Sequence, residues 1–168
     1  MIPKVNPMSI IFLRTANALD LQEMQQLFVN TVTTICCKDY NNEQLKAWIS
    51  GVKDTQRWLE RLDEQFVLLA TIDKQIVGFG SIRDENYLDM LYVHKDFQRQ
   101  GIAGKIYTQL EEKAREVNSS YIDADVSITA KPFFESIGFT VLAEQKVERM
   151  GVELVNYRMR KDWVFNKI

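Results

Sequence analysis

The sequence predicts a mixed α/β fold, with a central sheet of parallel and antiparallel strands and helices on both of its faces. Strand-like apolar runs in the middle of the chain are joined by brief polar connections, which is typical of antiparallel hairpins. Two further runs are separated by a helical pattern, as in a parallel crossover. With 168 residues the chain can also bury a sizeable core, and we expect a single domain over residues 1–168.

The first half of the chain contains one strand followed by helices and then a group of strands. An apolar run at residues 10–13 predicts the first strand, and apolar residues at helical spacing after Asp20 predict the first helix. A second helical region begins near Asn42. Gly51 interrupts this region, and Asp54 is a suitable N-cap for its continuation. Three strands are then expected, at residues 66–72, 76–82 and 87–93.

The second half contains a long amphipathic helix and three strands. Apolar residues recur every four positions from Ile102 to Ala114, which predicts a helix with one buried face. Apolar and acidic residues alternate over 122–126, as in a half-exposed strand. A short helix is expected at 130–137, ending at Gly138, because glycine tolerates the left-handed conformation found after helices. The last two strands are expected at residues 139–143 and 152–159.

Composition and charge restrict the class of protein. Hydrophobic residues make up 46% of the chain and charged residues 26%, which is typical of a globular protein in water. The net charge of −2 argues against a nucleic-acid-binding protein. No apolar run is long enough to span a bilayer, and residues 1–8 lack the apolar core of a signal peptide. We therefore expect a cytoplasmic protein with neither a nucleic-acid nor a membrane partner.

Cysteine and histidine do not form a metal-binding pattern. The two cysteines, Cys36 and Cys37, are adjacent in sequence, which is unfavourable geometry for a disulfide. The chain has one histidine and no spaced set of Cys and His ligands. We therefore expect no metal site.

The segment from Leu91 to Lys105 carries the clearest chemical signal. A strand leads into a polar turn and then into a helix whose first turn contains Gly101, Ala103 and Gly104. Small residues there leave backbone N–H groups uncovered at the positive end of the helix dipole, which suits a phosphate or pyrophosphate. The spacing fits neither a P-loop nor a dinucleotide-binding motif, and the alternative is that the glycines only permit close helix–strand packing. Side-chain donors and positive charge are available from Gln98, Arg99, Gln100 and Lys105.

Two segments resemble motifs of the GNAT N-acetyltransferase superfamily. Residues 98–103, Gln-Arg-Gln-Gly-Ile-Ala, are similar to its Gln/Arg-x-x-Gly-x-Gly/Ala signature between a strand and a helix. Residues 127–139, Ser-Ile-Thr-Ala-Lys-Pro-Phe-Phe-Glu-Ser-Ile-Gly-Phe, are similar to its Asn-x-x-Ala-x-x-x-Tyr-x-x-x-Gly-Phe segment. The expected element order agrees with that of the superfamily over nearly the whole chain. Residues 39–48 also resemble a bacterial subgroup.

The resemblance implies an acetyl-CoA-dependent N-acyltransferase that moves an acetyl group directly to a primary amine within a ternary complex. It implies that the pantetheine arm lies between two separated strands and pairs with the backbone of Leu91, Tyr92 and Val93. The pyrophosphate would then lie on the turn that follows. Dimers are common in the superfamily, so the resemblance is compatible with a homodimer, but the sequence does not specify the oligomeric state. The cofactor contacts expected in this turn and beyond it are Gln98, Arg99, Gln100, Gly101, Ile102, Ala103, Gly104, Lys105, Phe133 and Phe134.

One position departs from the pattern of the superfamily. Phe134 stands where the family has a tyrosine that often protonates the leaving thiolate, and phenylalanine has no proton to donate. The hydroxyl of Ser127 or Tyr121 could act instead, as could a water, or the thiolate could leave unaided. A binding module that retains acyl-CoA without catalysis is the alternative function. An interaction domain that binds no CoA is a third hypothesis.

Asp89 is the candidate general base. It lies in an apolar strand beside the proposed cleft, where partial burial strengthens a carboxylate as a proton acceptor. The alternative is a solvent-facing residue or a structural hydrogen-bond acceptor. The aromatic residues Tyr40 and Trp48 are candidates for contact with the acceptor, with core packing as their alternative. Whether the acceptor is a small amine, an aminoglycoside-like drug, a peptide or a protein is not specified by the sequence.

Overall fold

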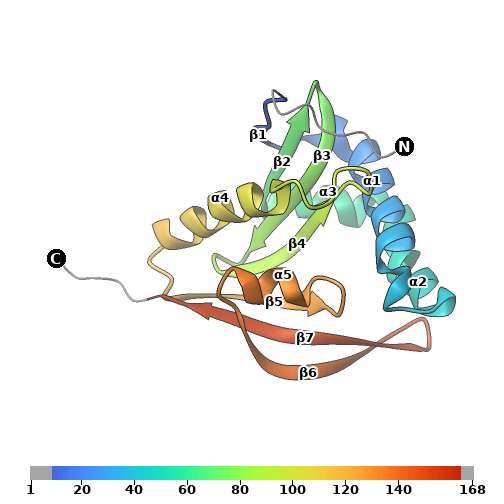
Figure 1. Cartoon of the computed structure of the whole chain (residues 1–168). Coiled ribbons are helices and arrows are strands. Elements are labelled where there is room, and N and C mark those ends of the chain that lie inside the picture. The colour runs from blue at the N-terminus through green and yellow to red at the C-terminus, as the bar shows by residue number, and fades with distance from the viewer. Residues whose placement is uncertain (1–8, 164–168) are drawn as a thin grey trace.

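A computed structural model describes residues 9–163, so residues 1–8, on which the expected absence of a signal peptide rests, lie outside the described residues. Its centre is a seven-stranded sheet with strand order β1-β2-β3-β4-β5-β7-β6 (Figure 1). β4 and β5 are parallel neighbours, and the other neighbouring pairs are antiparallel. The strands are β1 (Phe12–Thr15), β2 (Phe66–Ile72), β3 (Gln75–Arg83), β4 (Tyr87–Val93), β5 (Tyr121–Ser127), β6 (Thr140–Arg149) and β7 (Val152–Asp162).

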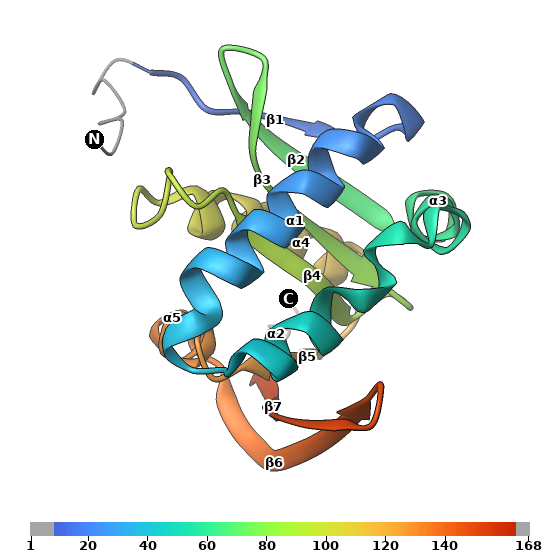
Figure 2. The ribbon, with the colours of Figure 1, turned by 90° about the vertical axis from the view of Figure 1, so that its right-hand side faces the viewer.

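Helices cover both faces of this sheet, as the sequence predicts. Figure 2 shows α1, α2 and α3 in front of the sheet and α4 behind it. Each face has its own buried apolar cluster, one containing residues of α1 to α3 and the other containing residues of α4 and α5. No helix within residues 9–163 is long and apolar enough to cross a bilayer. The helices are α1 (Leu21–Ile35), α2 (Asn42–Ile49), α3 (Thr55–Glu64), α4 (Ile102–Glu116) and α5 (Lys131–Ser136).

Side-chain caps explain where the helices of the first half begin. Asn41 and Gln44 form a capping box at the start of α2, in which each side chain accepts a hydrogen bond from the backbone N–H of the other. The predicted cap at Asp54 is confirmed, since its carboxylate accepts from the N–H of Arg57 at 3.1 Å. A short 3₁₀ turn at 50–53 divides the second helical region into α2 and α3.

The strands at the two ends of the sheet differ most from the prediction. β6 continues to Arg149 rather than ending at residue 143, and it pairs with β7 along its whole length. Nearly all side chains of β6 are exposed, so its sequence lacks the alternating apolar pattern from which the length of a strand can be predicted. β1 begins at Phe12 rather than at residue 10, with two apolar residues of the run left outside the ladder.

α4 contacts β3 through two glycines. A Cβ atom at Gly78 would lie 2.9 Å from a side-chain atom of Ile102, and one at Gly80 would lie 2.9 Å from atoms of Ile106 and Leu110. These distances are shorter than packed side chains tolerate, so α4 can approach the sheet this closely because both positions lack a side chain. The start of α4 is thereby held beside the end of β4.

Candidate functional site

β4 and β5 are paired over a short stretch and then separate. Their ladder contains Tyr87 opposite Asp123 and Leu88 opposite Ala124. Beyond these pairs, β4 stays bound to β3 as far as Val93, and β5 stays bound to β7 as far as Ser127 (Figure 1). The facing edges of the two strands are therefore not paired with each other over their second halves, although the carbonyl of Val93 accepts from the side chains of Gln98 and Thr31. An open strand edge offers unpaired backbone groups that can bind an extended ligand.

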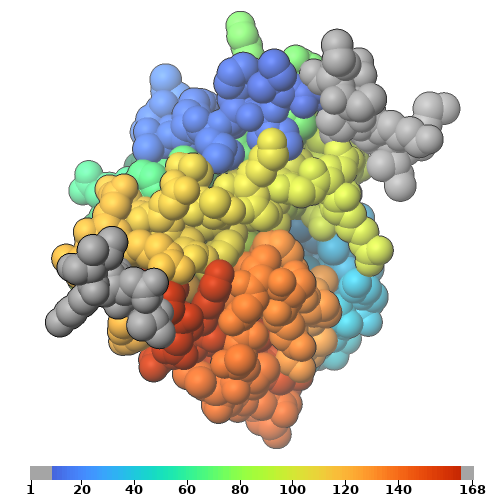
Figure 3. Space-filling view, turned by 60° about the vertical axis from the view of Figure 1, so that its left-hand side comes forward, coloured from blue at the N-terminus to red at the C-terminus, as the bar shows by residue number. Residues whose placement is uncertain are grey.

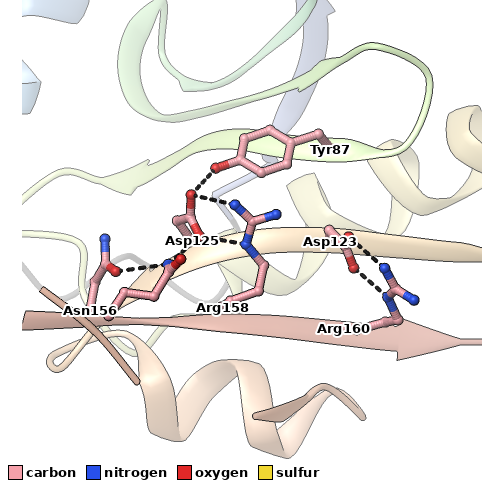
Figure 4. A network of polar contacts seen from close by, with 7 residues as sticks. Tyr87, Asp123, Asp125, Asn156, Arg158 and Arg160 are labelled. Atoms are coloured by element: carbon pink, nitrogen blue, oxygen red, sulfur yellow. Dashed lines mark hydrogen bonds and ion pairs between the residues drawn. The ribbon is translucent and has the colours of Figure 1, made fainter. Parts of the chain in front are cut away.

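Polar contacts tie the two strands together at the paired end of this opening. The hydroxyl of Tyr87 on β4 donates to Asp125 on β5 at 2.6 Å, and Arg158 on β7 donates to the same carboxylate at 2.7 and 3.1 Å (Figure 4). Burial raises the pKa of Asp125, but hydrogen bonds from Tyr87, Arg158 and Gln145 outweigh it and leave the pKa below its ordinary value. Asp123 is paired with Arg160 in the same way, at 2.6 and 2.9 Å. The two acidic residues of the alternating pattern at 122–126, Asp123 and Asp125, therefore lie at the closed end of the opening.

The turn between β4 and α4 is held in shape by its own side chains. Gln98 donates from Nε2 to the carbonyl of Val93 at 2.6 Å, and the Nδ1 atom of His94 accepts from the N–H of Asp96 at 3.1 Å. Burial lowers the pKa of His94, which suits this accepting role. Arg99 and Gly101 have positive φ angles of 59° and 79°. These two left-handed residues turn the chain sharply into α4.

The amides at the start of α4 are free to bind an anion. The N–H of Lys105 makes the first helical hydrogen bond, to the carbonyl of Gly101 at 3.1 Å. Within residues 9–163, the N–H groups from Gly101 to Gly104 donate to no backbone or side-chain acceptor. Four successive donors at the positive end of a 15-residue helix form a ready site for a phosphate group.

Gly101 and Gly104 do not serve close packing between helix and strand, which was the alternative explanation for glycine at these positions. A Cβ atom at Gly101 or Gly104 would meet nothing within 4 Å, so neither is needed for close contact between helix and strand. Close packing is instead the role of Gly78 and Gly80 on β3. The absence of side chains at positions 101 and 104 leaves the amides uncovered.

A groove begins at these glycines and follows α4. It has a volume of about 640 Å³, within the range of ligand-binding sites. Figure 3 shows the yellow surface of α4 bordering the orange surface of the segment that carries α5. Lys161 on β7 reaches into the groove and pairs with Glu111 on α4 at 2.7 Å. The groove is also lined by Gly101, Gly104, Lys105, Thr108 and Arg115.

A second cavity, of about 110 Å³, lies against β4 on the α1–α3 face of the sheet. A β-bulge brings Asp89 into it. Met90 pairs with Ser81 and Leu88 pairs with Ile82, so Asp89 is an extra residue of β4 with no partner on β3. The bulge puts Asp89 and Met90 in the same cavity wall as Tyr92. The other residues that line it are Phe28, Trp48, Gly51, Arg57, Trp58, Arg61 and Arg149.

Asp89 is held by several neighbours. Gln65 donates from Nε2 to its carboxylate at 2.8 Å, and the buried hydroxyl of Ser81 donates to Gln65 in turn at 2.7 Å. Arg61 and Arg83 lie 3.8 and 3.7 Å from the same carboxylate. This arrangement fixes the side chain at the cavity wall. It fits a structural acceptor and a base beside a substrate equally well.

The aromatic candidates divide between cavity and core. Trp48 and Tyr92 line the cavity, and burial raises the pKa of Tyr92 to about 12, so its hydroxyl keeps its proton at neutral pH. Tyr40 is buried, and its hydroxyl donates to the carbonyl of Val155 at 2.6 Å and accepts from the N–H of Ile128 at 3.0 Å. Tyr40 thus connects the start of α2 to β7 and to the end of β5. Its hydroxyl both donates and accepts a hydrogen bond within the fold.

The two candidate hydroxyls on β5 lie at opposite ends of that strand. Ser127 is at the open end, where its Oγ accepts from the N–H of Ala130 at 3.0 Å. Tyr121 is at the other end, with the guanidinium of Arg160 3.8 Å from the centre of its ring. Six residues of strand correspond to roughly 20 Å. The structure therefore does not bring Ser127 and Tyr121 together at one reacting group.

The remaining predicted cofactor contacts surround the opening. Leu91, Tyr92 and Val93 form the open part of β4. Phe134 is buried, with the ring of Phe139 5.0 Å away, so it belongs to the core beneath α5. Phe133 and Ala103 are half-buried, Ile102 is buried against β3, and Arg99 and Lys105 are exposed at the turn. Gln100 turns its amide oxygen inward, where it has no hydrogen-bond partner within residues 9–163.

Three arginines in the cavity were not predicted from the sequence. Arg57 and Arg61 are four residues apart on α3, a spacing that places both on one helix face and could have been noticed. Arg149 gives no such signal, because it comes from the end of β6.

In the described part of the chain, no group of three or more His, Cys, Asp or Glu residues is placed so that it could hold a metal ion.

The opening, the uncovered amides and the adjoining cavity together form the candidate site, whose shape and donors suit an extended, phosphate-bearing ligand. Comparison with known proteins gives the family. The Acetyltransferase (GNAT) domain family matches residues 36–161, which is more than half of the chain. The chain belongs to this family, and the resemblance noted in the sequence is confirmed.

Individual relatives agree in sequence and in fold. The chain is 37% identical over 153 residues to the Uncharacterized N-acetyltransferase YafP of Escherichia coli (strain K12), covering 91% of this chain and 97% of that one. A GCN5-related N-acetyltransferase structure from Rhodopseudomonas palustris, also named aminotransferase, class-II, is 29% identical, with a TM-score of 0.90 over 95% of this chain and 100% of the other. The PaiA N-acetyltransferase of Thermoplasma acidophilum in complex with coenzyme A is 16% identical, with a TM-score of 0.75 over 92% and 99% of the two chains.

Proposed function

We propose that this protein transfers the acetyl group of acetyl-CoA to a primary amine, directly and within a ternary complex. The observation that carries the proposal is the row of free amides from Gly101 to Gly104 beside the open edge of β4. These donors suit the pyrophosphate of CoA, and the open edge at Leu91, Tyr92 and Val93 suits its amide-containing pantetheine arm. The complex of the PaiA relative with coenzyme A supports the same assignment.

The second cavity is the proposed acceptor site. Acetyl-CoA supplies an activated acetyl thioester, and the chain must position the amine and accept its proton. As the new C–N bond forms and the C–S bond breaks, one proton leaves the amine and one reaches the departing sulfur. An amine of the lysine type has a pKa of about 10.4, so it is mostly protonated at neutral pH and needs an acceptor for that proton.

We assign the role of proton acceptor to Asp89 and expect Asp89→Asn to lower kcat by roughly 100-fold or more, the usual range for loss of a general base. The dissociation constant of acetyl-CoA should stay unchanged, because Asp89 lies on the opposite side of β4 from the groove along α4. Asparagine can still accept the hydrogen bond of Gln65, so the fold should be kept. Steady-state kinetics across pH, together with titration calorimetry, measure both quantities.

Asp84→Asn is the matched control for this prediction. Asp84 is exposed and lies 3.3 Å from Arg83, one of the two arginines beside Asp89. Its replacement removes the same charge outside the cavity and should leave kcat unchanged. A kcat of Asp89→Asn equal to that of the parent at every pH would leave Asp89 with the structural role only.

The proton for the departing sulfur comes from a hydroxyl or a water in this proposal, because Phe134 is buried and has none. Ser127 is the candidate on β5 at the open end of the cleft. Tyr92 is a further hydroxyl on β4 that keeps its proton at neutral pH. Comparing kcat for Ser127→Ala and Tyr92→Phe separates these two donors from water, which is favoured if neither variant loses activity.

The test of the proposed function is binding of acetyl-CoA and of CoA by titration calorimetry, followed by thiol release in the presence of an amine. Saturable binding with amine-dependent thiol release supports an active transferase. Binding without thiol release for any amine supports the alternative, an acyl-CoA-binding module without catalysis. Absence of binding at millimolar concentration overturns the proposal, because free amides and an open strand edge would then serve another ligand.

A further inference from the structure

The cavity beside Asp89 has a charge that the chain as a whole lacks. Three arginines, Arg57, Arg61 and Arg149, line it together with Asp89. Three positive charges and one negative charge give a local net charge of +2, whereas the chain has −2. The arginines converge from two separate elements, since Arg57 and Arg61 lie on α3 and Arg149 ends β6.

The positive charges of this cavity are only partly balanced by the fold. Asp89 already has two arginines near it, with Arg61 at 3.8 Å and Arg83 at 3.7 Å. Within the part of the chain that the structure describes, no carboxylate forms an ion pair with Arg57 or Arg149. Burial, together with repulsion from Arg57 and Arg149, lowers the pKa of Arg61 despite the nearby Asp89. A bound anion would relieve this repulsion.

Part of the cavity wall is aromatic. Trp48, Trp58 and Tyr92 line it, and the guanidinium of Arg61 lies 5.6 Å from the centre of the Trp58 ring. Small-molecule sites combine aromatic side chains with polar groups that fix the orientation of the ligand, and in this cavity the polar groups are unusually numerous. The volume of about 110 Å³ is below the range of roughly 300–1,000 Å³ for drug-sized ligands, so the cavity suits a small group.

We propose that this cavity binds an anionic group of the acyl acceptor, so that the acceptor is a small amine that also carries a carboxylate or a phosphate. The proposal rests on the proposed function and specifies its substrate class. Guanidinium groups bind both anions through paired N–H donors. The same positive charge disfavours the ammonium form of a nearby amine, which makes more of the neutral amine available for attack. Polycationic acceptors such as aminoglycosides and polyamines are disfavoured by the same repulsion.

The test compares thiol release for matched pairs of amines that differ in one charged group. The carboxylate arm uses 3-aminopropanoate against 3-aminopropanamide, the phosphate arm uses phosphoethanolamine against ethanolamine, and 1,3-diaminopropane is the cationic amine. Rates are compared per concentration of neutral amine, so that differences in the protonated fraction of the amines do not enter. We expect kcat/KM to be roughly tenfold or more higher for the anionic member of at least one pair, the effect of one charged hydrogen bond. The arm that shows the preference identifies the anion.

Two variants connect this preference to the cavity. Arg57→Gln and Arg149→Gln should each reduce the ratio of kcat/KM between the anionic amine and its neutral partner by roughly tenfold, mainly through a higher KM for the anionic amine. Both side chains are exposed, so their replacement should not unfold the protein. Lys53→Gln is the control, because Lys53 is an exposed cation just before α3 that does not line the cavity. It should leave the preference intact.

Failure of this proposal and failure of the proposed function give different results. The anionic acceptor is overturned, with the transferase left in place, if neither anionic amine has a higher kcat/KM than its neutral partner or if 1,3-diaminopropane has the highest kcat/KM of the five amines. If acetyl-CoA binds and no amine supports thiol release, the anion site is tested by binding alone. The CoA-bound protein is then titrated with 3-aminopropanoate and with phosphoethanolamine in a calorimeter. Saturable binding that Arg149→Gln weakens supports the anion site, and absence of binding at millimolar concentration overturns it. Absence of acetyl-CoA binding in the parent protein overturns both proposals.

Discussion

Gly104→Asp is expected to weaken the binding of CoA by roughly 100-fold or more, because like charges a few ångströms apart near a protein surface repel by several kcal/mol. Gly104 lies in the first turn of α4, where its N–H is free and a Cβ atom would meet nothing within 4 Å. The new carboxylate would occupy the place proposed for the pyrophosphate. Titration calorimetry with CoA measures the loss.

The free protein should tolerate Gly104→Asp well. An acidic side chain in the first turn of a helix interacts favourably with the dipole, by about 0.3–1 kcal/mol, and glycine is a poor helix former. The thermal midpoint should therefore be equal to or above that of the parent. Gly104 is a cleaner position for this test than Gly101, whose φ of 79° would strain any other residue.

Gly104→Asn is the control for charge. Asparagine has the same shape as aspartate without the charge, so it should reduce CoA affinity much less. If the two variants bind CoA equally well, the phosphate groups do not lie on this turn, and the cofactor site proposed from the amides is wrong.

Gly80→Ala is expected to destabilise the protein by about 2–3 kcal/mol, near the upper end of the usual penalty for overpacking. The added methyl group would lie 2.9 Å from side-chain atoms of Ile106 and Leu110 and 3.1 Å from the carbonyl oxygen of Met90. α4 must then move away from β3 or the buried side chains must leave their preferred rotamers. For a chain of this size the thermal midpoint should fall by roughly 5–10 °C. Urea unfolding gives the free energy directly.

Gly104→Ala is the matched control, with an effect of opposite sign. The same substitution in the open first turn of α4 should stabilise the protein by up to about 1 kcal/mol, because alanine is a better helix former than glycine. If Gly80→Ala is as stable as the parent, α4 does not pack on β3 as closely as the distances above require.

Local chemistry explains how much of the fold could be predicted. The helix cap at Asp54, the apolar spacing of α4 and the hairpin of β2 and β3 act over a few residues, so they could be predicted along the chain. Prediction was weakest for β6, whose exposed side chains carry little apolar pattern and whose length depends on pairing with β7. Backbone pairing between distant segments leaves a weak trace in local sequence.

The glycines show where spacing alone was ambiguous. Gly101 and Gly104 could serve either packing or phosphate binding, and the sequence contains nothing that separates these roles. The surroundings of each glycine separate the two roles. Gly101 and Gly104 adjoin open space, whereas α4 packs against Gly78 and Gly80. Whether a glycine avoids a clash or uncovers an amide depends on neighbours that are remote in sequence.

By itself, the sequence determined the family, the mixed sheet with helices on both faces and the turn that carries the free amides, because each follows from residues close together in the chain. The tertiary structure alone decided the composition of the acceptor cavity. Asp89 enters it through a β-bulge that depends on the register between β3 and β4. Arg57, Arg61 and Arg149 meet there only after α3 and the β6–β7 hairpin have packed around β4. Register and packing are long-range properties, so the charge of the cavity, unlike the turn beside it, could not be predicted from local sequence.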